Sequence, residues 1–226
     1  MSKKANEPQN QVQFDTYYQK GGVVLGPYST HIANHDPKHL VFLLSRYKFC
    51  SKMLEGKAKV LEVGCGDSFG TAITLQTVSS VLCIDIEPLV IEDNKNRKLY
   101  DGRATFAVHD ITTGPAGAGR FDAAYSLDVI EHIPADREHL YFENICKSLV
   151  DDGIFIMGTP NITSNQYASE GSRLGHINLK SHVTMREGMG RFFKNVFIFS
   201  MNDEVVHTGF GPMANYLLGV GVGVKR

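Results

Sequence analysis

The fold of this chain is decided by residues 60–70, which read VLEVGCGDSFG. Four residues that favour a buried strand run into a glycine-rich turn, and the residues after the turn suit a helix. Glycine lets a backbone bend tightly and approach a ligand without a Cβ in the way. A second apolar run, residues 81–84, ends in Asp85, whose carboxylate can accept hydrogen bonds from both hydroxyls of a ribose. The two features together predict a nucleoside-containing cofactor that lies across the ends of parallel strands.

The glycine spacing argues against two common classes of nucleotide site. A dinucleotide fingerprint needs a third glycine earlier than Gly70, which stands one position late. A phosphate-binding loop needs a Gly-Lys-Ser/Thr sequence, and none follows the turn. Glu62, two residues before the first glycine, suits a cationic ligand better than a pyrophosphate.

The E-x-G-x-G turn, the acidic end of the next strand and residues 121–133 (FDAAYSLDVIEHI) resemble class I S-adenosylmethionine-dependent methyltransferases. The resemblance runs from about Lys59 to Pro160 and is strongest to small-molecule enzymes of methyltransferase type 11 and the quinone O-methyltransferases. It implies S-adenosylmethionine as the cofactor. The cofactor-binding residues that it implies are Glu62, Gly64, Cys65, Gly66, Asp85, Ile86, Asp110, Ile111, Leu127 and Asp128.

Strands and helices alternate from Ala58 onward, which is typical of a doubly wound parallel α/β sheet. Strand sequences lie near 59–63, 80–85, 104–108, 121–126, 153–158, 196–200 and 216–222. We therefore expect a seven-stranded, mostly parallel, Rossmann-like sheet, and the resemblance implies that its last strand is antiparallel. Three regions are expected along the chain: a disordered tail (1–12), a helical N-terminal cap or lid (13–56) and the class I methyltransferase domain (57–226).

The amino-acid composition restricts the classes of binding partner that we expect. The chain has 23 basic and 24 acidic side chains, a formal charge of -1, whereas dedicated nucleic-acid binders usually carry a strong basic excess. The chain contains no run of eighteen apolar residues, so we expect no membrane span. The N-terminal residues lack the apolar core of a signal peptide, and the four cysteines form no C-x-x-C pair. We expect a cytoplasmic protein with a small-molecule acceptor, and the oligomeric state stays open.

The segment after the fourth strand, residues 128–134, has three interpretations. The Glu131-His132 pair holds the loop, or His132 is a general base near the transferred methyl group. The third interpretation is a divalent metal site formed by Asp128, Glu131, His132 and the later His176, similar to that of small-RNA 3′-terminal 2′-O-methyltransferases. Metal binding is the less favoured interpretation, because Asp128 departs from the glutamate of that pattern.

Two further histidines and two tyrosines are candidates for the acceptor site. His176 and His207 follow the fifth and sixth strands, and either reaches the acceptor if these strands are parallel. Tyr17 and Tyr18 are candidate substrate-binding residues of a lid hinged at Gly21-Gly22. His31, His35 and His39 are expected to be solvated or to line the substrate site.

The favoured function is methyl transfer from S-adenosylmethionine to an oxygen, less readily a nitrogen or carbon, of a sugar, lipid precursor or aromatic metabolite. The fourth strand is not followed by the Asn/Asp-Pro-Pro-aromatic element of amino-methylating enzymes. Methylation of RNA at the 2′-oxygen or at a base is one alternative. A methyltransferase-like binding subunit without activity is the other, and the intact E-x-G-x-G and Asp85 set argues against it.

Overall fold

Eight strands form one sheet in the computed structural model, which describes residues 4–117 and 119–226. The strands are β1 (Lys59–Val63), β2 (Ser80–Asp85), β3 (Ala104–Val108), β4 (Phe121–Leu127), β5 (Leu149–Pro160), β6 (Phe193–Asn202), β7 (Val205–His207) and β8 (Tyr216–Val224). Their spatial order is β3-β2-β1-β4-β5-β8-β6-β7. The first five are parallel to one another, so their carboxyl ends meet at one edge of the sheet.

The last strand is antiparallel, as expected, and lies between β5 and β6. The expected count of seven strands is wrong by one, because β7 forms a short antiparallel hairpin with β6. Only three residues, Val205–His207, belong to β7, and a segment of this length carries too few positions to show a period of two.

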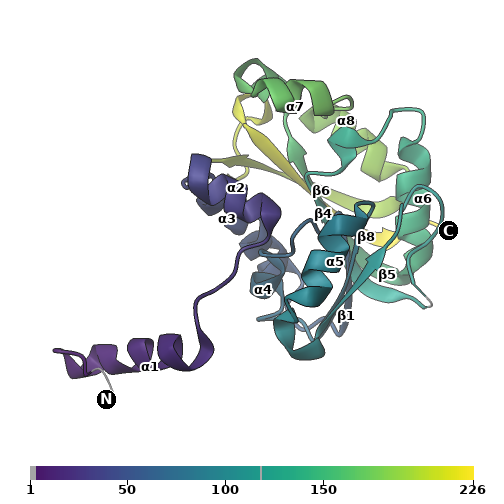
Figure 1. Cartoon of the computed structure of the whole chain (residues 1–226). Helices are drawn as coiled ribbons and strands as arrows, with labels where there is room; N and C mark the ends of the chain where they lie inside the picture. Colours follow the sequence, from purple (N-terminus) through teal and green to yellow (C-terminus); the bar gives the residue numbers. More distant parts are fainter. Residues whose placement is uncertain (1–3, 118) are drawn as a thin grey trace.

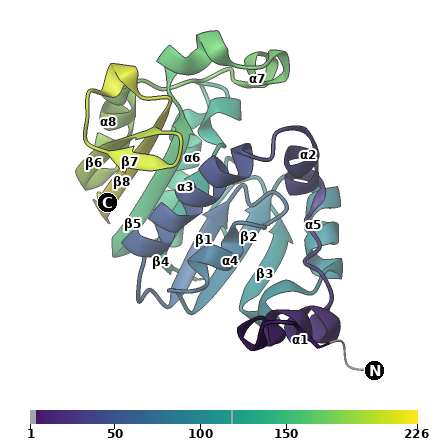
Figure 2. The same ribbon diagram turned by 90° about the vertical axis from the view of Figure 1, so that its left-hand side faces the viewer.

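Helices cover both faces of the sheet (Figure 1 and Figure 2). The α-helices are α1 (Gln11–Lys20), α2 (Pro27–His35), α3 (His39–Met53), α4 (Thr71–Thr74), α5 (Pro88–Asn96), α6 (Glu138–Ser148), α7 (Glu170–Gly175) and α8 (His182–Gly190). Short 3-10 turns are η1 (Pro8–Asn10), η2 (Leu99–Gly102), η3 (Ile130–His132), η4 (Ile162–Tyr167) and η5 (Gly211–Met213). None of the helices in the described ranges has the length and hydrophobicity that crossing a bilayer requires.

Alternation along the strands sends side chains into two separate cores. On β1, Leu61 and Val63 pack with residues of α6 and α8, while Val60 packs with residues of α3, α4 and α5. Glu62 shares the side of Val60, because successive strand residues point to opposite faces. This alternation decides where the acidic residue of the E-x-G-x-G turn lies.

The three α-helices that precede β1 lie in different places relative to the sheet. Helix α1 projects away from the sheet in Figure 1, while in Figure 2 α3 crosses a face of the sheet and α2 lies near the upper ends of the strands. Of the expected disordered tail, residues 1–3 lie outside the described part of the chain, residues 8–10 form η1, and α1 begins at Gln11. The division into a cap over residues 13–56 and a catalytic domain over residues 57–226 stays a proposal.

Candidate active site

A cavity of about 1260 Å³ lies at the carboxyl edge of the sheet. It spans the point where β1 is flanked by β2 on one side and β4 on the other, the usual ligand position in doubly wound sheets. Its wall includes most of the residues that the sequence predicts for the cofactor: Gly64, Cys65, Gly66, Asp85, Ile86, Asp110, Ile111, Leu127 and Asp128. Of the candidate catalytic and metal residues, it includes Asp128, Glu131, His132 and His176.

The backbone after β1 requires a glycine at position 64. Gly64 has a φ of +74°, and a Cβ built there would lie 2.1 Å from Cγ2 of Val129. Gly70, the glycine that stands one position late, has a different role: its missing Cβ leaves room for the ring of Tyr47, 2.2 Å from where that Cβ would be. The first glycine shapes the bend that faces the cavity, and the later one lets α3 pack against the turn.

Asp85 closes the bend from the neighbouring strand. Its two carboxylate oxygens accept hydrogen bonds from the backbone N–H groups of Gly66 and Glu87, each at 2.9 Å. Each carboxylate oxygen can accept more than one hydrogen bond, so both retain capacity for a ligand. The end of β2 is thereby coupled directly to the glycine turn.

Glu62 lies behind the turn and outside the cavity wall. It is 1% exposed, and its carboxyl oxygens accept hydrogen bonds from the Tyr47 hydroxyl (3.0 Å) and the Thr71 hydroxyl (2.7 Å). The side chain therefore joins α3 and α4 to β1, and we do not assign it a direct contact with the cofactor. Burial raises the pKa of Glu62 to about 7, against the hydrogen bonds that lower it.

Replacement of Glu62 by glutamine is expected to remove a pH dependence of stability. The folded pKa is raised above the ordinary value of 4.5, so the folded protein holds a proton that the unfolded chain has lost between about pH 4.5 and 7. Stability of the parent relative to Glu62→Gln should fall across this window, by at most about 3.5 kcal/mol at about 1.4 kcal/mol per pKa unit. Urea unfolding of both proteins at pH 5 and pH 8 measures the difference; parallel pH curves would contradict the assignment.

At the end of β3, Asp110 and Ile111 line the cavity next to each other. One carboxylate oxygen of Asp110 accepts hydrogen bonds from the backbone N–H (2.8 Å) and hydroxyl (2.7 Å) of Thr112. The other lies 3.9 Å from Arg137. Ile111 is buried and contributes an apolar surface. A carboxylate beside an apolar surface suits the amino edge and the face of an adenine ring.

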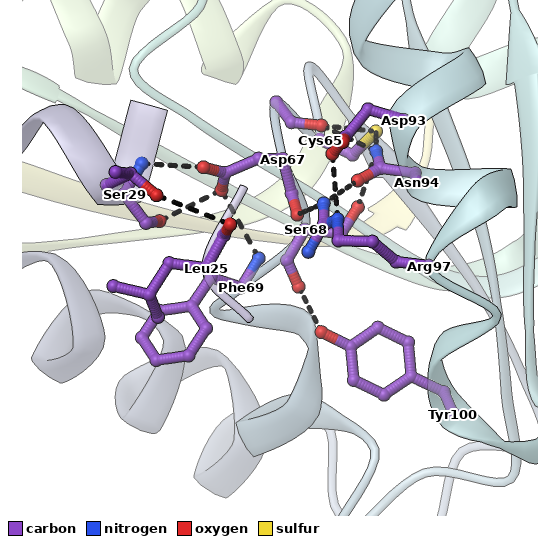
Figure 3. Close-up of polar contacts among 12 residues, drawn as sticks. Leu25, Ser29, Cys65, Asp67, Ser68, Phe69, Asp93, Asn94, Arg97 and Tyr100 are labelled. Atoms are coloured by element: carbon purple, nitrogen blue, oxygen red, sulfur yellow. Dashed lines mark hydrogen bonds and ion pairs between the residues drawn. The ribbon is translucent and has the colours of Figure 1, made fainter. Parts of the chain in front are cut away.

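A polar network ties the second helix of the cap to the glycine turn (Figure 3). The carboxylate of Asp67 accepts from the backbone N–H (2.6 Å) and the hydroxyl (2.9 Å) of Ser29, at the start of α2. On the other side of the turn, Arg97 donates to the Asp67 carbonyl oxygen (2.6 Å) and Asn94 donates to that of Gly66 (2.8 Å). Tyr100 donates to the Ser68 carbonyl oxygen at 2.5 Å. The turn is held in shape before any cofactor binds.

Asp128 occupies a strained position at the end of β4. Its φ is +58°, a left-handed conformation that non-glycine residues seldom adopt. Its carboxylate forms an ion pair with Arg46 of α3, with 2.5 Å between Nη1 and Oδ2. This pair joins the cap to the strand beneath the middle of the cavity.

Glu131, His132 and His176 lie together beside Asp128. One candidate ligand atom from each of the three lies within 4.8 Å of the others, and the two imidazole rings meet edge to face at 5.1 Å. Nδ1 of His132 lies 3.0 Å from the Gly175 carbonyl oxygen, which can only accept, so Nδ1 carries the proton. Burial lowers the pKa of His176, and neighbouring His132 lowers it further.

Glu131 is the buried member of this cluster. Its Oε2 accepts from the Thr159 hydroxyl at 2.9 Å, while Oε1 is buried without a hydrogen-bond partner in the described part of the chain. Burial raises the pKa of Glu131 to about 8, and the nearby carboxylate of Asp128 adds to the increase. Asp128, the fourth residue of the expected metal set, is not part of the cluster and is held by Arg46.

Most of the other predicted residues lie away from the cavity wall. Tyr17 and Tyr18 are 58% and 54% exposed on α1, and their rings contact each other at 5.5 Å. His207 belongs to β7, where its ring bonds to Asn202 and accepts the Gly209 N–H. His31 stacks on His35, while His39 does line the cavity.

The sequence predicted a cap or lid and gave His39 as a candidate lining residue, but it did not single out the other cap residues that line the cavity. Tyr28 and Ser29 of α2 and the α3 residues Phe42, Leu43 and Arg46 all line it. One signal was present: Gly26-Pro27 is a good helix start, since proline suits the first helical turn. The pairing of Arg46 with Asp128 spans 82 residues and leaves no local pattern.

Comparison with known proteins agrees with this geometry. Residues 61–157 match the family model of a methyltransferase domain. A curated relative, the mitochondrial ubiquinone biosynthesis O-methyltransferase of Schizosaccharomyces pombe, is 26% identical over 129 residues, which cover 55% of this chain and 44% of the relative. The chain thus aligns with less than half the length of that relative.

Solved structures show the same fold at low identity. The N-methyltransferase NodS from Bradyrhizobium japonicum WM9 is 15% identical with a TM-score of 0.61, covering 85% of this chain and 99% of its own. The methyltransferase domain of bacterial CtHen1-C is 18% identical with a TM-score of 0.66, covering 80% and 99%. NodS has also been crystallised with S-adenosyl-L-homocysteine. Residues 61–157 thus match a methyltransferase domain, and the sheet and the cavity at the glycine turn have the fold that these solved methyltransferases share.

Proposed function

We propose that this protein transfers a methyl group from S-adenosylmethionine to an oxygen of a small-molecule acceptor, with His132 as the general base. The observation that carries the proposal is the hydrogen bond from Nδ1 of His132 to the Gly175 carbonyl oxygen, at 3.0 Å. It fixes the tautomer of the neutral ring, so Nε2 keeps a free lone pair in a side chain that lines the cavity.

For this reaction the protein must position the acceptor oxygen and remove its proton. Methyl transfer is an in-line displacement, in which the acceptor oxygen is held about 3 Å from the methyl carbon. The bond from sulfur to that carbon breaks, its electron pair stays on sulfur, and the acceptor oxygen forms the new bond. The hydroxyl proton must leave during this step, and the free nitrogen of His132 is suited to take it.

The cofactor is proposed to lie along the turn between β1 and α4. Gly64, Cys65 and Gly66 would hold the methionine part, and Asp85 would accept from the ribose hydroxyls. Asp110 and Ile111 would hold the adenine, with Ile86 exposed beside them at the cavity wall. Leu127 and Asp128, at the end of β4, would lie beneath the sulfonium. The cavity of about 1260 Å³ exceeds the 300–1,000 Å³ usual for one ligand, which leaves space for an acceptor.

An oxygen acceptor is favoured by two observations. The curated relative is an O-methyltransferase, although NodS, of similar fold, acts on nitrogen. The segment after β4 lacks the Asn/Asp-Pro-Pro-aromatic element of amino-methylating enzymes. Incubation with methyl-labelled S-adenosylmethionine and a panel of hydroxylated sugars, lipid precursors and phenols tests the proposal. Label in ether linkage on one class supports it; label only on amines or on carbon contradicts it.

RNA is the alternative acceptor class, because structures of small-RNA methyltransferase HEN1 share the fold. The near-zero net charge gives no electrostatic attraction to a phosphate backbone. Short single-stranded RNA in the same panel separates the two classes. The cytoplasmic location stays a prediction that cell fractionation can test.

Removal of divalent metal is expected to leave turnover unchanged. Glu131, His132 and His176 could hold a metal ion, but the neighbouring carboxylate of Asp128 is engaged by Arg46. The chelator EDTA, followed by added Mg²⁺, Mn²⁺ or Zn²⁺, measures the dependence. Loss of turnover with chelator and its recovery with metal would instead assign these three residues as ligands of a metal that binds the acceptor oxygen.

A further inference from the structure

The guanidinium of Arg46 is a buried cation in the acceptor half of the cavity, by which we mean the part lined by Arg46, Asp128, Glu131 and His132. Its side chain is 12% exposed, and one face lies on the ring of Tyr216, 3.9 Å from Cζ to the ring centre. It also forms part of the cavity wall, together with His39 and Phe42 on the same side of α3. Arginine buried this deeply usually has its charge matched and its N–H groups bonded.

The hydrogen bonding of Arg46 is incomplete. Of its five N–H groups, Nη1 donates to Asp128, while Nε is buried and has no partner in residues 4–117 and 119–226. A side chain whose role was only to join α3 to β4 would be expected to use its remaining donors within the protein, since unpaired buried donors are costly.

The charges around Arg46 leave room for an anion. Of the carboxyl groups that share the acceptor half, Asp128 is already paired, and Glu131 bonds to Thr159. Another acid, Asp203, lines a smaller pocket of about 150 Å³, and Arg46 also forms part of the wall of that pocket. An anion is therefore favoured on the main-cavity side of Arg46. A sulfonium donor would add a positive charge to that cavity, which an anionic acceptor would offset.

We propose that the acceptor carries a carboxylate or phosphate group and that Arg46 binds this group, which makes Arg46 the residue that determines acceptor specificity. The proposal rests on the function proposed above and narrows its acceptor class. Arginine suits this role because its planar fork of donors matches the geometry of both anions.

The test measures binding of small probes to the protein loaded with S-adenosylhomocysteine. Benzoate and phenyl phosphate are the anionic probes, and benzamide is the neutral probe of the same size as benzoate. EDTA is present throughout, so that binding of an anion through a metal ion is excluded. We expect at least one anionic probe to bind about tenfold or more tightly than benzamide, a gap of about 1.4 kcal/mol. Comparing the two anions distinguishes a carboxylate acceptor from a phosphate.

Three variants separate recognition from a structural role. Arg46→Gln should abolish the preference for anions without changing benzamide binding. If the glutamine variant does not fold, Arg46→Lys replaces it in the test and should keep part of the preference. Asp128→Asn should strengthen anion binding, because it removes the carboxylate that competes for the guanidinium. Arg120→Gln, which removes an exposed arginine paired with Asp151, is the matched control and should change nothing.

Equal affinity of all three probes for the parent protein, or no anion binding at millimolar concentration, overturns the inference. The inference is also overturned if Arg46→Gln keeps the preference for anions, or if Asp128→Asn binds anions with unchanged affinity. The titration with S-adenosylhomocysteine that precedes each experiment tests the proposed function separately. If that titration shows binding and the probes show no preference, only the assignment of Arg46 fails.

Discussion

Replacement of His132 by alanine is expected to lower kcat by about 10²–10⁴-fold, the usual contribution of a positioned acid or base. The reason is the fixed tautomer: Nδ1 donates to the Gly175 carbonyl oxygen, so the other nitrogen is free to accept the acceptor's proton. Affinity for S-adenosylhomocysteine should stay as in the parent, because the predicted cofactor contacts are made by other residues. Single-turnover methylation together with calorimetry measures the two quantities.

The matched control is His207→Ala. This imidazole is bonded within the hairpin of β6 and β7 and lies outside the cavity wall, so its removal should leave kcat near the parent value. If His132→Ala kept full turnover, His132 would only hold the loop that carries Gly175. If cofactor affinity fell as much as kcat, the side chain would belong to the cofactor site.

Replacement of Asp85 by alanine is expected to weaken binding of S-adenosylmethionine by about 1–3 kcal/mol, or about 5- to 150-fold in Kd. The loss comes from hydrogen bonds between the ribose hydroxyls and a charged acceptor. Asp85 also accepts the N–H groups of Gly66 and Glu87, so part of the effect would come from a looser turn. Calorimetric titration of both proteins with the cofactor gives the difference.

Asp122→Ala separates these two contributions. Asp122 also accepts two backbone N–H groups, those of Ala58 and Lys59 at 2.9 and 2.8 Å. Whereas Asp85 lies at the carboxyl end of β2, Asp122 lies at the start of β4. Its removal should lower the free energy of unfolding and leave cofactor affinity unchanged. Equal cofactor affinity of Asp85→Ala and the parent would remove Asp85 from the cofactor site.

The sheet was predictable because its signals are local. Each central strand is a short apolar run closed by a turn, and the cofactor residues stand at the points where those runs end. Parallel strands bring such ends to one edge whatever the details of packing. Gly64, Asp85 and Asp110 therefore converge in the structure as the sequence predicts.

The position of Glu62 was not predictable from its motif alone. Alternation places it opposite Leu61 and Val63, but which face carries α3 is decided by packing between distant segments. Tyr47 and Thr71, which bond to its carboxyl group, come from helices on either side of β1 in the chain. The same holds for Arg46 and Asp128, since ion pairs across 82 residues leave no periodic signal.

The N-terminal cap was predicted in part. The apolar spacing of α3 is visible in the sequence, and Pro37 lies between α2 and α3. Helix α2 is nine residues long, mostly polar and partly exposed, so no apolar period marks it. Its attachment through Ser29 to Asp67 depends on the tertiary fold.

A crystal structure of the protein grown with S-adenosylhomocysteine is the most direct measurement. The ligand is expected to lie along residues 64–66, with its ribose hydroxyls on the Asp85 carboxylate and its adenine beside Asp110 and Ile111. Its sulfur should face the end of β4, toward the half of the cavity that holds His132. A ligand bound elsewhere, or a cavity left empty at saturating ligand, would contradict the account.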